Sequence, residues 1–289
     1  RKNGEKPFVK YYTNKARQAG MTLIELVVVL LILVGLSGLL IPSVQGFLSK
    51  THDSTAVDSL KEVDKQILAY SAMYSGHPDN MDSLIEDTAD GVIDYAMNAA
   101  LFTPYTLAGA MNADAVQLEN MGIKNVMTMQ AAPGDGNYTF AATNVSEPIA
   151  TGSVLASIDM TKLSSTTSTC TDVVFADAAA PTTAESDLCL ESLLGRSAGS
   201  IDSANMTYLA FGVGNDASLI GKTMHEAPIH FAKEGGMNAG SKYNRIIAIY
   251  EIKTADMSGH MMAKYLGTMM PMMKLEGYAS AIKNAYAPG

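Results

Sequence analysis

The most unusual ionisable residue in this chain is Glu25, because it lies inside an apolar run. From Met21 to Ile41 there are 21 residues, and Glu25 is the only ionisable one. An acid near the centre of a membrane helix costs about 2.5–3.5 kcal/mol, and less near the helix end, so Glu25 should have a partner or lie near the headgroups. Cleavage after the small residue Gly20 would create an α-amino group on Met21. That cation could pair with Glu25 within one helix or between staggered neighbours.

The flank of this run is strongly basic. Six Lys or Arg residues and a single acid, Glu5, occupy residues 1–20. As a helix, residues 21–41 would span about 31 Å, which is enough to cross a hydrocarbon core of about 30 Å. The positive-inside bias then places residues 1–20 in the cytoplasm and the bulk of the chain outside. We therefore predict a leader at 1–20 and a retained transmembrane or filament-core helix at 21–41.

Gly20 followed by Met-Thr-Leu-Ile-Glu and an unbroken apolar run resembles the N-terminus of a type IV prepilin, the family that includes the pseudopilins of type II secretion. The resemblance covers about residues 17–50. It implies cleavage between Gly20 and Met21 by a prepilin peptidase, N-methylation of Met21, and a role for Glu25 in drawing each subunit into register. Pro42 also matches the family pattern, while Met at the cleavage position and a long leader are more typical of the long-leader pilin branch.

The resemblance implies a structural protein without enzymatic activity or cofactor, with adhesion and motility among the functions of such filaments. Its partners would be the prepilin peptidase, an inner-membrane assembly platform, and identical or related subunits in a helical homo-oligomer. The chain would reside in the inner membrane with a periplasmic head before entering an extracellular pilus or a periplasmic pseudopilus. Head size favours a pilus subunit over a secretion pseudopilin. A third alternative, from a different class, is a signal-anchored extracytoplasmic binding or enzymatic domain, for which Gly20 and Glu25 would be dispensable.

Charge is partitioned sharply along the chain. The leader carries six of the 20 Lys and Arg and one of the 29 Asp and Glu, so residues 21–289 hold 14 bases against 28 acids, a formal charge of −14. A head that acidic is unsuited to gripping nucleic acid by counterion release, so we predict no nucleic-acid partner. Such a charge favours solubility and limits stray association.

The two cysteines, Cys170 and Cys189, both lie in the predicted exported part. In an oxidising compartment we expect a disulfide that closes a loop of about 20 residues and contributes about 3 kcal/mol. The alternative is two free buried thiols. In many pilins a disulfide pins a surface loop near the C-terminus, whereas this pair lies in the middle of the chain.

Two near-motifs elsewhere lack a residue that their chemistry requires. Gly221-Lys222-Thr223 is similar to the end of a phosphate-binding loop, but the required glycine position is Asp216, whose carboxylate would repel phosphate. His225 and His230 are similar to paired zinc ligands on a helix, yet they are five residues apart and Pro228 would break that helix. We interpret these segments as turns and predict no metal site.

Three further patterns also favour ordinary structural roles. Asp135-Gly136-Asn137 could begin a calcium loop, but the twelfth position is Ser146 rather than Glu. The lone residues His52 and His77 are interpreted as solvated side chains at helix ends. Several C-terminal methionines could suggest copper ligation, but Met is far more often a gap-filling apolar residue; they are Met257, Met261, Met262, Met269, Met270, Met272 and Met273.

The apolar helix should continue beyond the membrane segment as an amphipathic helix over 42–74. Gly35, Gly38 and Pro42 weaken the first part, because Pro42 cannot donate a hydrogen bond to the carbonyl of Gly38 and its ring crowds that turn. We predict a kink, which in this family would allow the segment to loosen as the subunit leaves the membrane. An apolar stripe follows at helical spacing; its members are Leu60, Val63, Ile67, Tyr70 and Tyr74.

This stripe could be a coiled-coil seam or the spine of a head, and the strand-rich chain that follows favours the spine. We therefore predict an α+β fold in which the long helix packs on a globular head, residues 75–289, that holds an antiparallel β-sheet. Expected helices are 81–88, 92–101, 111–121 and a closing helix at 272–286. Expected strands begin at 138 and cover 153–160, 171–176, 206–213, 228–232 and 244–252, the last two forming a hairpin.

Overall fold

The computed structural model describes residues 23–86, 101–107, 114–129, 145–163, 183–229, 243, 245–253 and 262–270. The side chains of residues 37–54, 56, 86 and 129 lie outside this description. The chain divides into two compact units, residues 1–48 and residues 49–289. This division does not test the predicted boundaries at residues 20, 41 and 74.

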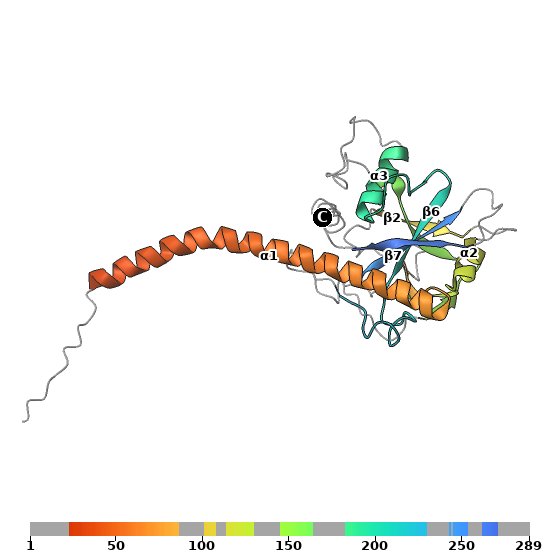
Figure 1. Ribbon diagram of the computed structural model, residues 1–289, viewed down its shortest axis with the longest axis horizontal. Helices are drawn as coiled ribbons and strands as arrows, with labels where there is room; N and C mark the ends of the chain where they lie inside the picture. Colours follow the sequence, from red (N-terminus) through yellow and green to blue (C-terminus); the bar gives the residue numbers. More distant parts are fainter. Residues whose placement is uncertain are drawn as a thin grey trace, which may run out of the picture. The chain divides into compact units, whose positions relative to one another are not determined.

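The described elements combine a very long helix with a sheet and short helices (Figure 1). The helices are α1 (Leu23–Tyr74), α2 (Asp114–Met121), the 3-10 turn η2 (Met160–Lys162) and α3 (Thr183–Leu193). The strands are β1 (Met81–Glu86), β2 (Phe102–Thr106), β3 (Asn125–Met129), β4 (Ser146–Pro148), β5 (Val154–Ile158), β6 (Met206–Gly212), β7 (Ile247–Lys253) and β8 (Lys264–Met269). The α+β class is confirmed.

The part of α1 that belongs to the head buries one stripe, as the sequence predicts. The buried members follow one another at steps of three or four residues; they are Val57, Leu60, Val63, Ile67 and Tyr70. Tyr74 is the exception, with 51% of its surface exposed at the last residue of the helix. The helix ends where Gly76 and Pro78 interrupt the pattern, which confirms the predicted end at Tyr74.

Hydrogen bonds fix this stripe against the head, so α1 is a spine here and not an isolated seam. Thr268 Oγ1 donates to the Leu60 carbonyl at 3.3 Å, and Thr223 Oγ1 donates to the Gln66 carbonyl at 3.2 Å. The Tyr265 hydroxyl donates to the Asp64 carboxylate. Since these donors come from both β8 and a distant turn, the register of α1 on the head is specified at several points.

The sheet is mixed, so the prediction of an antiparallel sheet is wrong for one pair. β1 and β3 run parallel, with Met81 opposite Val126, while the other described pairs are antiparallel. A parallel pair needs a crossover, and α2 lies in the chain between the two strands. Asp79, just before β1, fixes the alignment because its Oδ1 accepts from the backbone N–H groups of Lys124 and Asn125 at 2.8 and 2.6 Å.

Strand β6 is the centre of the sheet and has three partners. It pairs with β7 from Met206 to Gly212 on one edge. Its other edge is divided, since β5 joins at Leu209 and β1 joins at Gly212. A strand has only two edges, so the sheet separates beyond β6 into an arm of β5 and β2 and an arm of β1, β3 and β4.

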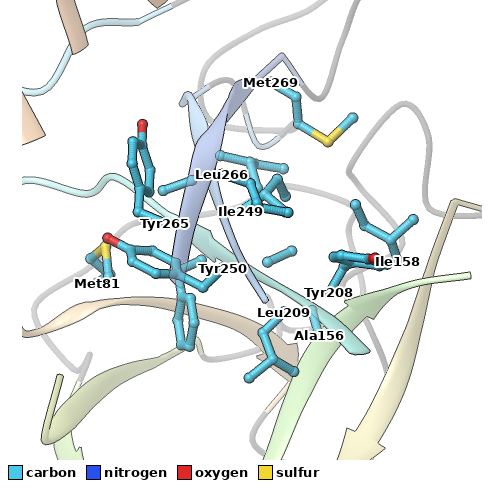
Figure 2. Packing of buried hydrophobic residues seen from close by; sticks show 14 of the residues in the cluster. Met81, Ala156, Ile158, Tyr208, Leu209, Ile249, Tyr250, Tyr265, Leu266 and Met269 are labelled. Carbon is cyan, nitrogen blue, oxygen red and sulfur yellow. The ribbon is translucent and has the colours of Figure 1, made fainter. Parts of the chain in front are cut away.

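The core of the head lies where β6, β7 and β8 meet the spine. Figure 2 shows the side chains of Tyr250 and Tyr265 next to each other on the adjacent strands β7 and β8, with Leu209 and Ala156 on the neighbouring strands. The two tyrosine ring centroids are 5.2 Å apart. Tyr208 and Tyr250 are almost completely buried, so the head is built around aromatic rings and not only aliphatic chains.

Some predicted elements are confirmed and others are wrong. The strands at 153–160, 206–213 and 244–252 correspond to β5, β6 and β7, and the helix at 111–121 contains α2. The predicted helix at 81–88 is instead the strand β1. Strand β8 was not predicted.

Only the base of the predicted hairpin between 228–232 and 244–252 is described, where Ile229 forms an antiparallel bridge with Arg245. Residues 230–242 lie outside the described residues, so the hairpin stays a prediction. Most of 92–101 and all of the predicted elements beginning at 138, at 171–176 and at 272–286 lie outside the described residues.

The outer strands of the described sheet carry features that discourage pairing with another chain. β2 contains Pro104 and β4 ends with Pro148, and neither residue can donate a ladder hydrogen bond. In β8 the register shifts so that Leu266 is an extra residue, and Arg196 donates to its carbonyl through Nε and Nη2. Strand edges protected in this way do not favour the addition of a strand from another chain, so contacts between subunits would use other surfaces.

Candidate functional site

The predicted assembly residue Glu25 lies in the first turn of α1. Gly20 and Met21 lie outside the described residues. The N-terminal turn of a helix carries partial positive charge on its unpaired N–H groups, and a carboxylate there is stabilised by about 0.3–1 kcal/mol. The pairing of Glu25 with an α-amino group on Met21 stays a prediction, because Met21 lies outside the described residues.

The helix on both sides of Glu25, from Leu23 to Leu36, is apolar on all sides and exposed. Its large apolar side chains keep between 43% and 82% of their surface accessible. These residues are Leu23, Ile24, Leu26, Val27, Val28, Val29, Leu30, Leu31, Ile32, Leu33, Val34 and Leu36. A helix that is apolar all round is normally covered by a protein core or a membrane. Within the described part of the chain, this apolar segment stays largely uncovered.

A search of the described residues finds no helix with both the length and the apolar character needed to cross a membrane. The predicted span at 21–41 is therefore not confirmed.

The residues predicted to weaken the helix do not interrupt it. α1 continues through Gly35, Gly38 and Pro42 as one helix. A Cβ added at Gly35 would meet no atom within 4 Å, so packing inside the chain does not require glycine there. The predicted loosening at these positions stays a prediction.

The predicted disulfide lies partly within the described chain. Cys189 is fully buried on α3 and is disulfide-bonded. Cys170 lies outside the described residues, so its pairing with Cys189 stays a prediction. The neighbouring Glu191 accepts hydrogen bonds from the backbone N–H groups of Ser200 and Ile201 at 2.7 and 3.1 Å, which ties the loop after α3 to the helix.

His77 is half-buried just after the end of α1, so its interpretation as a solvated residue is only partly right. Its ring packs edge-on against Tyr250, with centroids 5.5 Å apart, and lies 5.6 Å from the ring of Tyr265. Burial lowers the pKa of His77 to about 4, so the ring is neutral at physiological pH. Its Nδ1 is 3.3 Å from the Tyr250 hydroxyl. The side chain of His52 lies outside the described residues.

Sequence analysis did not predict the buried carboxyls, of which Asp82 on β1 has a strongly shifted pKa. Burial raises the pKa of Asp82 to about 6, while a hydrogen bond from Tyr243 and the charge of Arg245 oppose that rise. The Tyr243 hydroxyl donates to Asp82 Oδ2 at 2.8 Å. A Cβ at Gly214 would lie 2.4 Å from Asp82 Oδ1, so the turn after β6 approaches this carboxyl closely only because residue 214 is glycine. In the sequence, the sign that could have indicated a strand here is that the polar Asp82 alternates with the apolar Met81.

The near-motifs have structural roles where the chain is described. Lys222 Nζ donates to the Tyr70 hydroxyl at 3.2 Å and lies 4.8 Å from the ring centre of Tyr74, so it holds the end of the spine. Met269 and Met270 are fully buried apolar residues. Among the described residues no group of His, Cys, Asp and Glu could hold a metal ion, and His230 lies outside them.

Comparison with known proteins identifies the N-terminal segment. A family model described as the prokaryotic N-terminal methylation motif matches residues 15–40. No curated protein matches the chain, and no solved structure matches it. The matched residues contain the predicted cleavage site, Glu25 and most of the exposed apolar helix. The chain thus carries the prokaryotic N-terminal methylation motif, consistent with the type IV prepilin and pseudopilin family.

Proposed function

We propose that this chain is a structural subunit of a type IV pilus-like filament, processed by a prepilin peptidase and assembled through its N-terminal helix. One observation carries the proposal: the methylation motif at 15–40 contains a helical segment, Leu23 to Leu36, whose large apolar side chains are exposed on all sides. Neighbouring subunits would cover these apolar side chains in the filament. Each Å² of apolar surface buried in this way stabilises the association by about 25 cal/mol.

In this proposal, the inner membrane covers the helix before assembly and other copies cover it afterwards. The head would then be periplasmic first and exposed on an extracellular filament, or on a periplasmic pseudopilus, later. Glu25 sets the stagger by pairing with the N-methylated α-amino group of Met21 on a neighbouring subunit. In an apolar core an unpaired carboxylate is costly, so only one axial offset between subunits satisfies both charges.

The head fits a structural role in two ways. Its core and its spine form one body that does not depend on the N-terminal unit, since the cover of α1 from Val57 onward comes from residues within 49–289. The protected outer strands also make uncontrolled sheet-to-sheet association unfavourable. We further propose that the chain is not an enzyme and that its inner-membrane partners are those of pilin assembly.

The proposal predicts separate effects for the two N-terminal positions. Gly20→Phe should block processing, because a bulky ring replaces the only residue without a side chain at the cleavage point. Glu25→Ala should leave a processed, membrane-bound chain that enters filaments at less than a tenth of the wild-type level, because the stagger loses its charge pair. Immunoblots of sheared surface material and membrane fractions measure both effects.

Glu62→Ala is a suitable control, since Glu62 is an exposed acid on the head portion of the same helix. It should be processed and incorporated normally. Normal incorporation of the Glu25→Ala chain would contradict the stagger role. Wild-type behaviour of both N-terminal variants would favour a signal-anchored domain. A wild-type chain that is processed but confined to the cell envelope would favour a pseudopilin.

A further inference from the structure

A pocket of about 600 Å³ lies in the head beside the outer edge of β8. Its described walls come from α1, His77 just after α1, the end of α2, the residues after α3, and the chain from Met262 to Gly267. Small-molecule sites in proteins commonly measure 300–1,000 Å³ and occur where several elements converge. The pocket belongs entirely to the compact unit 49–289 and therefore does not depend on the N-terminal helix.

The edge of β8 does not favour an added strand as the occupant of this pocket. The extra residue Leu266 interrupts the regular spacing of hydrogen-bonding groups, and Arg196 already donates to its carbonyl. Ala263 N–H, at the start of the same segment, donates to the Gln117 carbonyl of α2 at 3.0 Å. An extended peptide would find these backbone groups occupied or out of register.

The walls of the pocket are mostly apolar and aromatic. Leu194 and Leu266 are buried beside it, and the neutral ring of His77 and the ring of Tyr265 contribute flat surfaces. Leu68 and Met262 flank the opening, with 53% and 52% of their surfaces exposed. Apolar side chains on either side of an opening would gain from contact with an apolar ligand body.

The polar groups of the pocket include two cations with donors to spare. A guanidinium carries five N–H donors, and Arg196 directs only Nε and Nη2 to Leu266. The ammonium of Lys264 contacts Glu251 Oε1 at 3.2 Å, and its side chain is 55% exposed. Among the described lining residues the acid is Asp64, which accepts a hydrogen bond from Tyr265 on the α1 side. Glu251 offsets part of the charge of Lys264, so the exposed guanidinium of Arg196 and the exposed part of Lys264 are the groups that an anionic partner would contact.

We propose that this pocket binds a small organic anion, with an apolar or aromatic body against Leu68, Tyr265 and His77 and a carboxylate, sulfonate or phosphate group facing Arg196 and Lys264. The charge of Asp64 repels the anionic group from the α1 side and so orients the ligand. This site is independent of filament assembly, because none of its residues belongs to the N-terminal unit.

A matched pair of probes tests the proposal. 2-Naphthalenesulfonate and the uncharged 2-naphthalenesulfonamide have nearly the same body and differ in charge. Binding to the full chain in nonionic detergent is measured by equilibrium dialysis, with micelles alone in a parallel cell to subtract partitioning. We expect one saturable site for the sulfonate. The sulfonamide should bind at least about tenfold more weakly, because the loss of one charge-assisted hydrogen bond lowers affinity by about that factor.

Two substitutions on the same helix locate the site. Leu68→Asp places a negative charge at the opening and should weaken sulfonate binding about tenfold or more. Met73→Asp is the control, because Met73 is 65% exposed on α1 and does not line the pocket. Both positions are exposed, so both variants should fold. Absence of saturable sulfonate binding, equal affinity for both probes, or equal binding by the two variants would each overturn the proposal.

Discussion

The two ends of α1 have similar apolar residues but opposite environments. Between Leu23 and Leu36 the large apolar side chains are at least 43% exposed, whereas from Val57 to Tyr70 the stripe is at most 7% exposed. The head covers its part of the helix with β8, the turn at 218–223 and the aromatic core. The difference teaches that the described residues of the head bury their own part of the helix, while the described residues leave the N-terminal segment uncovered.

The largest expected effect comes from comparing the same substitution at both ends. Leu60→Ala should lower the free energy of unfolding by about 2–5 kcal/mol, because it leaves a cavity under the sheet. Leu30→Ala, where half of the side chain is already exposed, should leave the unfolding of the head unchanged. Urea unfolding of the full chain in detergent, followed by near-ultraviolet circular dichroism of the tyrosines, measures both. Equal destabilisation by the two variants would contradict the difference in burial between the two ends of α1.

The next effect concerns Asp82 and is confined to the head. Its folded pKa of about 6 lies above the model-peptide value of 3.8, so the folded state binds this proton more tightly than the unfolded state does. The group therefore favours folding below about pH 3.8, and that contribution is lost, by about 3 kcal/mol in total, as pH rises through 6. Asp82→Asn should remove this dependence, which urea unfolding at a series of pH values would reveal. An unchanged pH profile would refute the burial of a titrating carboxyl.

A smaller effect of opposite sign belongs to His77. Its folded pKa of about 4 lies below the model value of 6.5, so the folded state binds this proton less tightly. The contribution of His77 to stability is present above pH 6.5 and is lost as pH falls toward 4. Partial solvation reduces its size. His77→Gln should therefore unmask the Asp82 slope between pH 4 and 6, and Asp82→Asn should unmask the His77 slope. Slopes of the same sign in the two variants would contradict these assignments.

The sequence predicted features that depend on neighbours in the chain. The end of α1 follows from the helical period and the break at Gly76 and Pro78, and β6 and β7 follow from compact apolar runs. The methylation motif is likewise a local pattern, which the family match at 15–40 confirms. These features need no knowledge of distant contacts.

The features that were missed depend on partners far away in the chain. β1 has a sequence compatible with a helix, and its strand form comes from pairing with β3 and β6. His77 is half-buried and contacts Tyr250, which is 173 residues away. The pocket likewise forms where α1 meets β8, a packing that no local pattern encodes. Tertiary contacts overrode local preference at each of these places.

The most direct test of the account is the N-terminus of the assembled protein. Intact-mass and N-terminal peptide mass spectrometry would be applied to sheared surface filaments and to the membrane fraction. The account predicts filaments built from chains that begin at N-methylated Met21. A chain that keeps residues 1–20 in every fraction would contradict it, because the exposed helix would then lack the charge that pairs with Glu25 and brings each copy into register.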